Sequence, residues 1–143
     1  MASQTLLDTI EQVRDFHEAF GISCAKKPQG SVGMEGAQLR HELLRGENEE
    51  YLATAKQGNL VEVADALGDM LYILCGTILK HGLQVRIWAV FQEIQCRNMG
   101  KFSNDTRPVL RVDGKVLKGE NYFRPDIASV LGEKRRKQWT FQH

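Results

Sequence analysis

The chain has 143 residues, of which 42% are hydrophobic and 26% are charged, and its formal net charge is +1. This composition is ordinary for one globular domain that buries its own core, so we expect a single domain over residues 1–143. The small net charge argues against nucleic acid as a partner, and no uncharged run is long enough to cross a membrane. Three cysteines without a pairing or metal motif, behind an N-terminus without a signal-peptide pattern, indicate a cytoplasmic location.

Apolar residues spaced three and four positions apart predict four helices in the first hundred residues. Residues 21–36, which contain a proline and four glycines, are expected to form a loop after the first helix. The third helix has clear end signals, because Asn59 is a favourable N-cap and Gly82 a favourable C-terminal stop. The four predicted helices cover residues 5–20, 38–56, 60–81 and 84–99.

The helical pattern ends near residue 101. Residues 109–117 form two short extended segments around Asp113-Gly114, which is the signal of a type I′ hairpin. A short final helix is predicted at Asp126–Leu131, and the basic tail, 132–143, is expected to be solvated rather than a nucleic-acid patch. The sequence therefore predicts an all-α fold, with a four-helix-bundle-like core, a short C-terminal hairpin and a small last helix.

The third predicted helix carries acids on one face only. Glu62, Asp65 and Asp69 fall within one narrow arc, and nearly every other position is apolar or small. A helix of this kind is typically buried, and a buried carboxylate needs a cation beside it. A stripe that simply faces solvent is the alternative, which we disfavour because no basic residue stands on this helix before Lys80. For Glu62, a capping box with Asn59 explains the residue as well as a ligand role does.

The second predicted helix places Glu47 and Glu50 one turn apart on the side of its apolar residues, whereas Glu49 points away. A short turn makes the second and third helices antiparallel neighbours, so the two acidic pairs should face each other. Such an oxygen-rich site suits Mg²⁺ or Mn²⁺ and the binding of phosphates, with Glu47 or Glu50 as the acceptor of a proton from water. The expected metal ligands are Glu47, Glu50, Glu62, Asp65 and Asp69.

Three segments, ENEEYLATAKQGNLVEVADALGDMLYILCGTILKHG, EIQCRNMGKF and RVDGKVLKGENYFRPDI, resemble the all-α nucleoside triphosphate pyrophosphohydrolase superfamily, and its MazG-like branch in particular. The resemblance implies Mg²⁺-dependent hydrolysis of an NTP or dNTP to the monophosphate and pyrophosphate, as in clearing unwanted nucleotides. It also implies that Glu47, Glu50 and Asp69 are metal ligands, and that the protein is a homodimer or homotetramer.

Two positions depart from the superfamily pattern. Gly46 stands where a further Glu usually precedes the ExxE motif, and Ala66 stands where an acid usually lies three residues before Asp69. Asp65 is on the right face to take the place of the second acid. The loss at Gly46 leaves three readings open: a changed number of metal ions, a weaker activity, or Glu49 in the missing role.

Asn98 is expected to face inward at the end of the fourth helix, with Lys101 one turn later, where the resemblance implies an Asn-x-x-Lys pair for phosphate or sugar. Trp88 and Phe91 fit a core or oligomer contact better than a stacking site for a base. Residues of the hairpin segment are expected to reach the substrate, namely Lys115, Lys118 and Tyr122.

Two other functions remain open at this point. One is a phosphoribosyl-ATP pyrophosphohydrolase-like activity, which would use the same metal site. The other is a non-catalytic helical module that binds a nucleotide or a partner protein, a reading that Gly46 favours.

Overall fold

The computed structural model describes residues 3–100, 110–115 and 126–132. Within these ranges the regular elements are five helices and no strand, which confirms the predicted all-α fold. None of the helices in these ranges is long and apolar enough to cross a membrane. The helices are α1 (Leu6–Ala19), α2 (Met34–Lys56), α3 (Leu60–Lys80), α4 (Ile87–Met99) and α5 (Ile127–Leu131).

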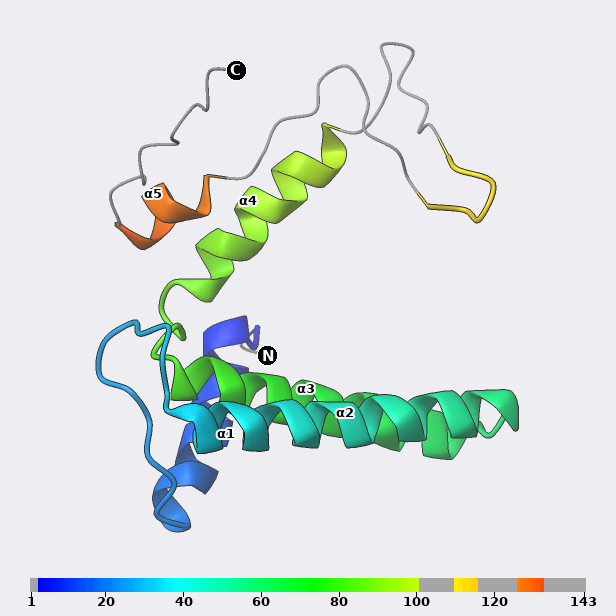
Figure 1. Cartoon of the computed structure of the whole chain (residues 1–143), viewed down its shortest axis with the longest axis horizontal. Helices are drawn as coiled ribbons and strands as arrows, with labels where there is room; N and C mark the ends of the chain where they lie inside the picture. The colour runs from blue at the N-terminus through cyan, green and yellow to red at the C-terminus, as the bar shows by residue number, and fades with distance from the viewer. Residues whose placement is uncertain (1–2, 101–109, 116–125, 133–143) are drawn as a thin grey trace. The chain divides into compact units, whose positions relative to one another are not determined.

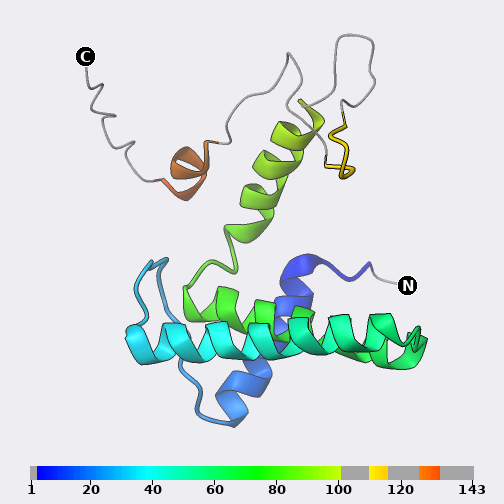
Figure 2. The same cartoon turned by 45° about the vertical axis from the view of Figure 1, so that its right-hand side comes forward.

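The chain divides into two compact units, residues 1–85 and 86–143. The first unit contains α1, α2 and α3, and the second contains α4 and α5 (Figure 1). In the first unit α2 and α3 lie side by side as an antiparallel pair, and α1 crosses them (Figures 1 and 2). The single domain expected from composition stays a prediction, and the tail beyond Gly132 lies outside the described residues.

α1 begins where its local sequence predicts. The Thr5 hydroxyl accepts a hydrogen bond from the Asp8 backbone N–H at 3.1 Å, and Asp8 Oδ2 accepts one from the Thr5 backbone N–H at 2.9 Å. This reciprocal pair is a capping box, which satisfies two amides that have no acceptor within the helix. The helix ends before Gly21, whose φ of 68° closes it.

α2 begins four residues earlier than predicted. Gly36, which was expected in the loop, lies in the first turn of the helix. Gly33, with a φ of 78°, is the N-cap, and its carbonyl accepts the first helical hydrogen bond from Ala37 at 3.0 Å. A glycine in the first turn interrupts no helical bond, since amides there have no acceptor in the helix. α3 begins at Leu60 and ends before Gly82, as predicted.

A buried polar cluster holds the three helices of the first unit together. Arg40 of α2, which is 9% exposed, donates from Nε to Thr77 Oγ1 at 3.0 Å and from Nη2 to the Ile73 carbonyl at 2.9 Å. Gly76 of α3 lies under this guanidinium, and a Cβ there would stand 2.6 Å from Arg40 Nη2 and 2.9 Å from His17 Nε2. The close approach of the three helices therefore requires glycine at position 76.

His17 belongs to the same cluster and is 3% exposed, although a lone histidine in a helical pattern is more typical of a surface or interface position. Burial, followed by the positive charges of Arg40 and Lys80, lowers the pKa of His17. Its Nδ1 lies 3.5 Å from Cys24 Sγ. The histidine thus packs as a neutral ring between α1 and α3.

Within the first unit, α3 is buried on only part of its surface, whereas its composition predicts burial nearly all round. Ala66, Cys75, Ile78 and Leu79 are buried, but a stripe of leucines on the same helix is 46–79% exposed. The reason is that α1 and α2 alone pack against α3 in the first unit. We call this surface the leucine stripe, and it consists of Leu60, Leu67, Leu71 and Leu74.

In the second unit, α4 begins at Ile87, three residues later than predicted, and contains no buried residue. The small helix α5 is capped by Asp126, whose carboxylate accepts hydrogen bonds from the backbone N–H and hydroxyl of Ser129. The backbone N–H of Asp126 donates to Glu93 Oε1 at 2.8 Å. This bond fastens the start of α5 to α4.

A turn is present at Asp113-Gly114 as predicted, but the predicted turn type is wrong. The Arg111 carbonyl accepts from the Gly114 N–H at 2.8 Å, and the Arg111 N–H donates to the Lys115 carbonyl at 2.7 Å. This pattern is a three-residue loop with glycine in the left-handed conformation (φ 84°), rather than a two-residue type I′ turn. The flanking segments, 109 and 116–117, lie outside the described residues.

The Gly76 contact yields a matched pair of stability predictions. Gly76→Ala should lower the free energy of unfolding by about 1–3 kcal/mol, because the hydrogen-bonded Arg40 and the buried His17 leave no room for a methyl group. Gly68→Ala on the same helix has nothing within 4 Å of its Cβ and should raise stability by up to about 1 kcal/mol. Urea unfolding of both variants measures this, and equal effects would contradict the close packing at position 76.

Candidate active site

Four carboxylates of α2 and α3 converge at one edge of the contact between these helices. Glu47 is half-buried, whereas Glu50, Asp65 and Asp69 are exposed. Burial raises the pKa of Glu47, and the negative charges of Asp69, Glu50 and Asp65 raise it further. The two acidic pairs therefore lie within electrostatic reach of each other, as the antiparallel packing of their helices predicts. We call these four residues the acid cluster.

Glu47 is the centre of this cluster because one of its oxygens lacks any partner. Its Oε2 is buried and accepts no hydrogen bond, and none of the four acids forms an ion pair within the described ranges. A buried carboxylate oxygen that is surrounded by like charge is unfavourable as an anion. An oxygen-donor set of this kind fits a hard divalent cation such as Mg²⁺ or Mn²⁺.

The acid cluster is assembled only in part. Among the described residues, no three His, Cys, Asp or Glu side chains stand close enough together to hold an ion as they are. Glu50, Asp65 and Asp69 are exposed and make no side-chain hydrogen bond in this part of the chain. No hydrogen bond or ion pair of the described residues therefore holds these three side chains in their present rotamers.

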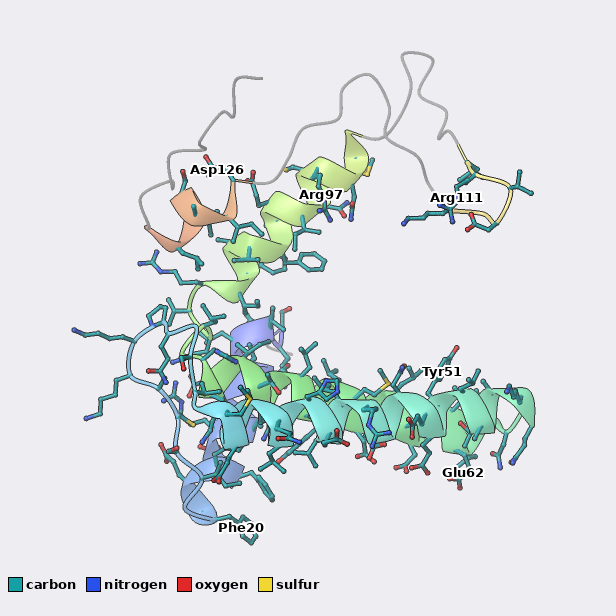
Figure 3. The ribbon with its side chains drawn as sticks, viewed as in Figure 1. Phe20, Tyr51, Glu62, Arg97, Arg111 and Asp126 are labelled. Atoms are coloured by element: carbon teal, nitrogen blue, oxygen red, sulfur yellow. The ribbon has the colours of Figure 1, made fainter. Side chains whose placement is uncertain are left out.

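Glu62 stands apart from the cluster, since its charge is not among those that raise the pKa of Glu47. The Asn59 side chain accepts from the Glu62 N–H at 3.2 Å, but the Asn59 N–H donates to the Thr54 carbonyl. The reciprocal half of the capping box is absent, so the cap does not use the Glu62 carboxylate. Glu62 points to the opposite side of the α2–α3 pair from Tyr51 (Figure 3).

The two departures from the superfamily pattern have different surroundings. Ala66 is 1% exposed between the helices, so the acid of this turn is supplied by Asp65 at the open edge. Gly46 has no atom within 4 Å of where a Cβ would stand, so this position has room but no acid. Glu49 is ion-paired with Arg45 at 2.9 Å on the exposed face of α2, and its charge is not among those that raise the pKa of Glu47.

An aromatic patch lies beside the acid cluster, and the sequence analysis did not find it. Phe16 packs on Phe20 with ring centroids 4.6 Å apart and meets the ring of Tyr72 edge-on at 5.7 Å. The three rings are 41%, 71% and 43% exposed. Tyr72 follows Asp69 by three residues and so lies on the same side of α3. The sequence signal is the i, i+4 pair of Phe16 and Phe20 in α1, a spacing that is equally typical of a buried helix face.

The remaining predicted site residues belong to the second unit or lie outside the described ranges. Asn98 is exposed on α4 instead of facing inward, and Lys115 is exposed in the turn. Trp88 and Phe91 stack with centroids 5.8 Å apart and are both more than half exposed among the described residues. The predicted residues outside the described ranges are Lys101, Lys118 and Tyr122.

The chain was compared with models of known protein families. Residues 13–98 match the model of the phosphoribosyl-ATP pyrophosphohydrolase family. The chain belongs to this family. The family is part of the all-α nucleoside triphosphate pyrophosphohydrolase superfamily, so the resemblance is confirmed at that level and indicates a pyrophosphohydrolase. The matched range contains the whole acid cluster and the aromatic patch. No curated protein matches the chain.

Binding of a cation to the acid cluster should stabilise the folded protein, which can be measured without an activity assay. Mg²⁺ should raise the melting temperature of the wild type by several degrees, since saturation at about a hundred times Kd adds ~2.7 kcal/mol. Asp69→Asn should melt higher than the wild type in EDTA, because less negative charge faces Glu47, and should gain little from Mg²⁺. Glu49→Gln is the control and should respond as the wild type; equal Mg²⁺ shifts in all three would count against the site.

Proposed function

We propose that this member of the phosphoribosyl-ATP pyrophosphohydrolase family hydrolyses an NTP or dNTP to the monophosphate and pyrophosphate with Mg²⁺. The observation that carries the proposal is the buried, unpartnered oxygen of Glu47 beside three further acids on α2 and α3. Four carboxylates alone would repel a triphosphate, so the site requires a cation between protein and substrate. Mg²⁺ would be held by Glu47, Glu50, Asp65 and Asp69, and Mn²⁺ would fit the same oxygen set.

The chemistry follows from what these residues can do. A bound cation neutralises phosphate oxygens and lowers the pKa of water. Glu47 is the favoured acceptor of the proton from the attacking water, because burial and the negative charges of Asp69, Glu50 and Asp65 raise the pKa of this carboxylate. The water oxygen then forms a bond to the α-phosphorus as the bond to the β-phosphate oxygen breaks. Pyrophosphate leaves and the nucleoside monophosphate remains.

The aromatic patch is the proposed platform for the base. Phe20 is its most exposed ring, and Tyr72 is the ring nearest in sequence to the acid cluster. Stacking of a base on an aromatic ring is worth about 1–3 kcal/mol and tolerates any base. The patch therefore supports a nucleotide substrate and leaves the choice of base to other contacts.

A second candidate substrate is phosphoribosyl-ATP, which the family match favours. Its hydrolysis breaks the same bond, between the α- and β-phosphates, and would use the same acids. A panel that contains this compound beside the NTPs and dNTPs separates the two candidates.

We also propose that the protein is a homodimer in which a second copy covers the leucine stripe of α3. Exposed leucines in a row favour burial by association, at about 25 cal/mol per Å² of apolar surface. Sedimentation should give the mass of two or more chains, and Leu67→Lys with Leu71→Lys should lower it to one. A monomeric wild type at micromolar concentration would contradict the proposal.

The activity is tested by measuring pyrophosphate release from the substrate panel with Mg²⁺. Glu47→Gln should lower kcat by about 10²–10⁴-fold, the usual contribution of a general base, while Glu49→Gln should keep the wild-type rate. Phe20→Ala should raise KM more than it lowers kcat. A folded, Mg²⁺-responsive chain that releases no pyrophosphate from any of these compounds would favour the non-catalytic nucleotide-binding module.

A further inference from the structure

A cavity of about 240 Å³ lies at the end of α3 that is remote from the acid cluster. The loop between α1 and α2 and the last turn of α3 form its walls. Its polar lining comes from Ser23, Gln29, Ser31 and Lys80, and no acidic residue lines it. Lys80 lies eleven residues after Asp69, or about 16 Å along the helix axis. The cavity is therefore separate from the acid cluster.

Lys80 gives this cavity a positive charge that no acid neutralises. Its Nζ donates to Ser23 Oγ at 2.8 Å and to the Ser23 carbonyl at 3.3 Å, which leaves one of its three N–H groups. It forms no ion pair with any residue that the structure describes. The loop at residues 22–33, which forms one wall, contains no acid; its two lysines, Lys26 and Lys27, do not line the cavity.

Acidic residues approach the cavity only from α1. Glu18 and Glu11 both act on the pKa of Cys24, which lines the cavity, and Arg14 and Lys80 act on it in the opposite direction. Glu11 is neutralised by Arg14, whose Nε lies 2.9 Å from its carboxylate. Of the remaining two charges, Lys80 lines the cavity and Glu18 does not.

The cavity is held open by hydrogen bonds between the loop and the end of α3. The Ala25 N–H donates to the Leu79 carbonyl at 3.2 Å, and the Gln29 N–H donates to the His81 carbonyl at 2.9 Å. The loop also lies directly on Gly82, where a Cβ would clash with the Lys27 carbonyl. These two carbonyls lie at the negative, C-terminal end of α3. Because they accept hydrogen bonds from the loop, they repel an anion in the cavity less than free carbonyls would.

We infer that this cavity binds a phosphate-type oxyanion. An ammonium group, two hydroxyls and a side-chain amide supply the donors that phosphate oxygens accept, and lysine binds phosphate as a point charge. The volume equals that of about eight water molecules at ~30 Å³ each, which is room for pyrophosphate or the phosphate end of a nucleotide. The inference does not depend on the proposed catalytic activity.

The test is calorimetric titration of the full chain in EDTA, where the acid cluster has no cation and repels anions. Pyrophosphate, orthophosphate and AMP are the titrants. We expect saturable binding to one site per chain, weakened about tenfold or more by Lys80→Gln. Tighter binding of AMP than of pyrophosphate would assign the cavity to a nucleotide's phosphate, and the reverse order to the free anion.

Two further variants keep this test decisive. Ser31→Asp adds a negative charge to the cavity wall without removing a hydrogen bond that the structure describes, so it should also abolish binding, even if Lys80→Gln fails to fold. Lys56→Gln removes an exposed lysine at the other end of α2 and should bind as the wild type. The inference is overturned by absence of saturable binding, by binding that survives Ser31→Asp, or by equal losses in the two lysine variants.

Discussion

The arrangement of the first unit depends on the packing of α2 against α3, and among the described residues this contact contains one charged group of each sign without a partner of opposite charge. Arg40 is buried without a carboxylate, and Glu47 has a buried oxygen without a donor. Both residues face α3 from α2, seven residues apart, so about 10 Å of helix separates them. Arg40 is satisfied by oxygens of α3, at Ile73 and Thr77, and it stabilises the packing. Glu47 has no such partner, which leaves it available to a cation.

The two ends of this contact consequently differ in rigidity. At the Arg40 end, Gly76 lies against the guanidinium and the His17 ring, so any added atom would displace one of them. At the Glu47 end, Gly46 and Gly68 face open space, and the other three acids are exposed. One end therefore fixes how the helices pack, while the other leaves side chains able to rearrange. A site that must gather carboxylates around an ion and then admit a charged substrate needs this combination of a rigid backbone and adjustable side chains.

Features that depend on neighbouring residues could be predicted from the sequence, and features that depend on the crossing of distant helices could not. The start of α1 follows from Thr5 and Asp8, and the meeting of the acidic pairs follows from helical period and a short turn. The aromatic patch joins Phe16 to Tyr72 across fifty-six residues, so it depends on how α1 crosses α3. The capping box expected at Asn59 and Glu62 forms only in half, because the Asn59 N–H donates to the carbonyl of Thr54 in the preceding helix.

An acid at position 65 instead of position 66 lies on a different side of α3. On α3 these positions differ by about 100°, and Asp69 lies between them. Position 66 faces α2, where Ala66 is buried, whereas Asp65 lies on the edge that continues through Tyr72. Moving the charge by one residue therefore shifts it out of the helix contact and onto the line of the aromatic patch. A cation held by Asp65 and Asp69 would lie on the side of α3 where the rings are exposed, so phosphates and base of one nucleotide can be reached from a single face.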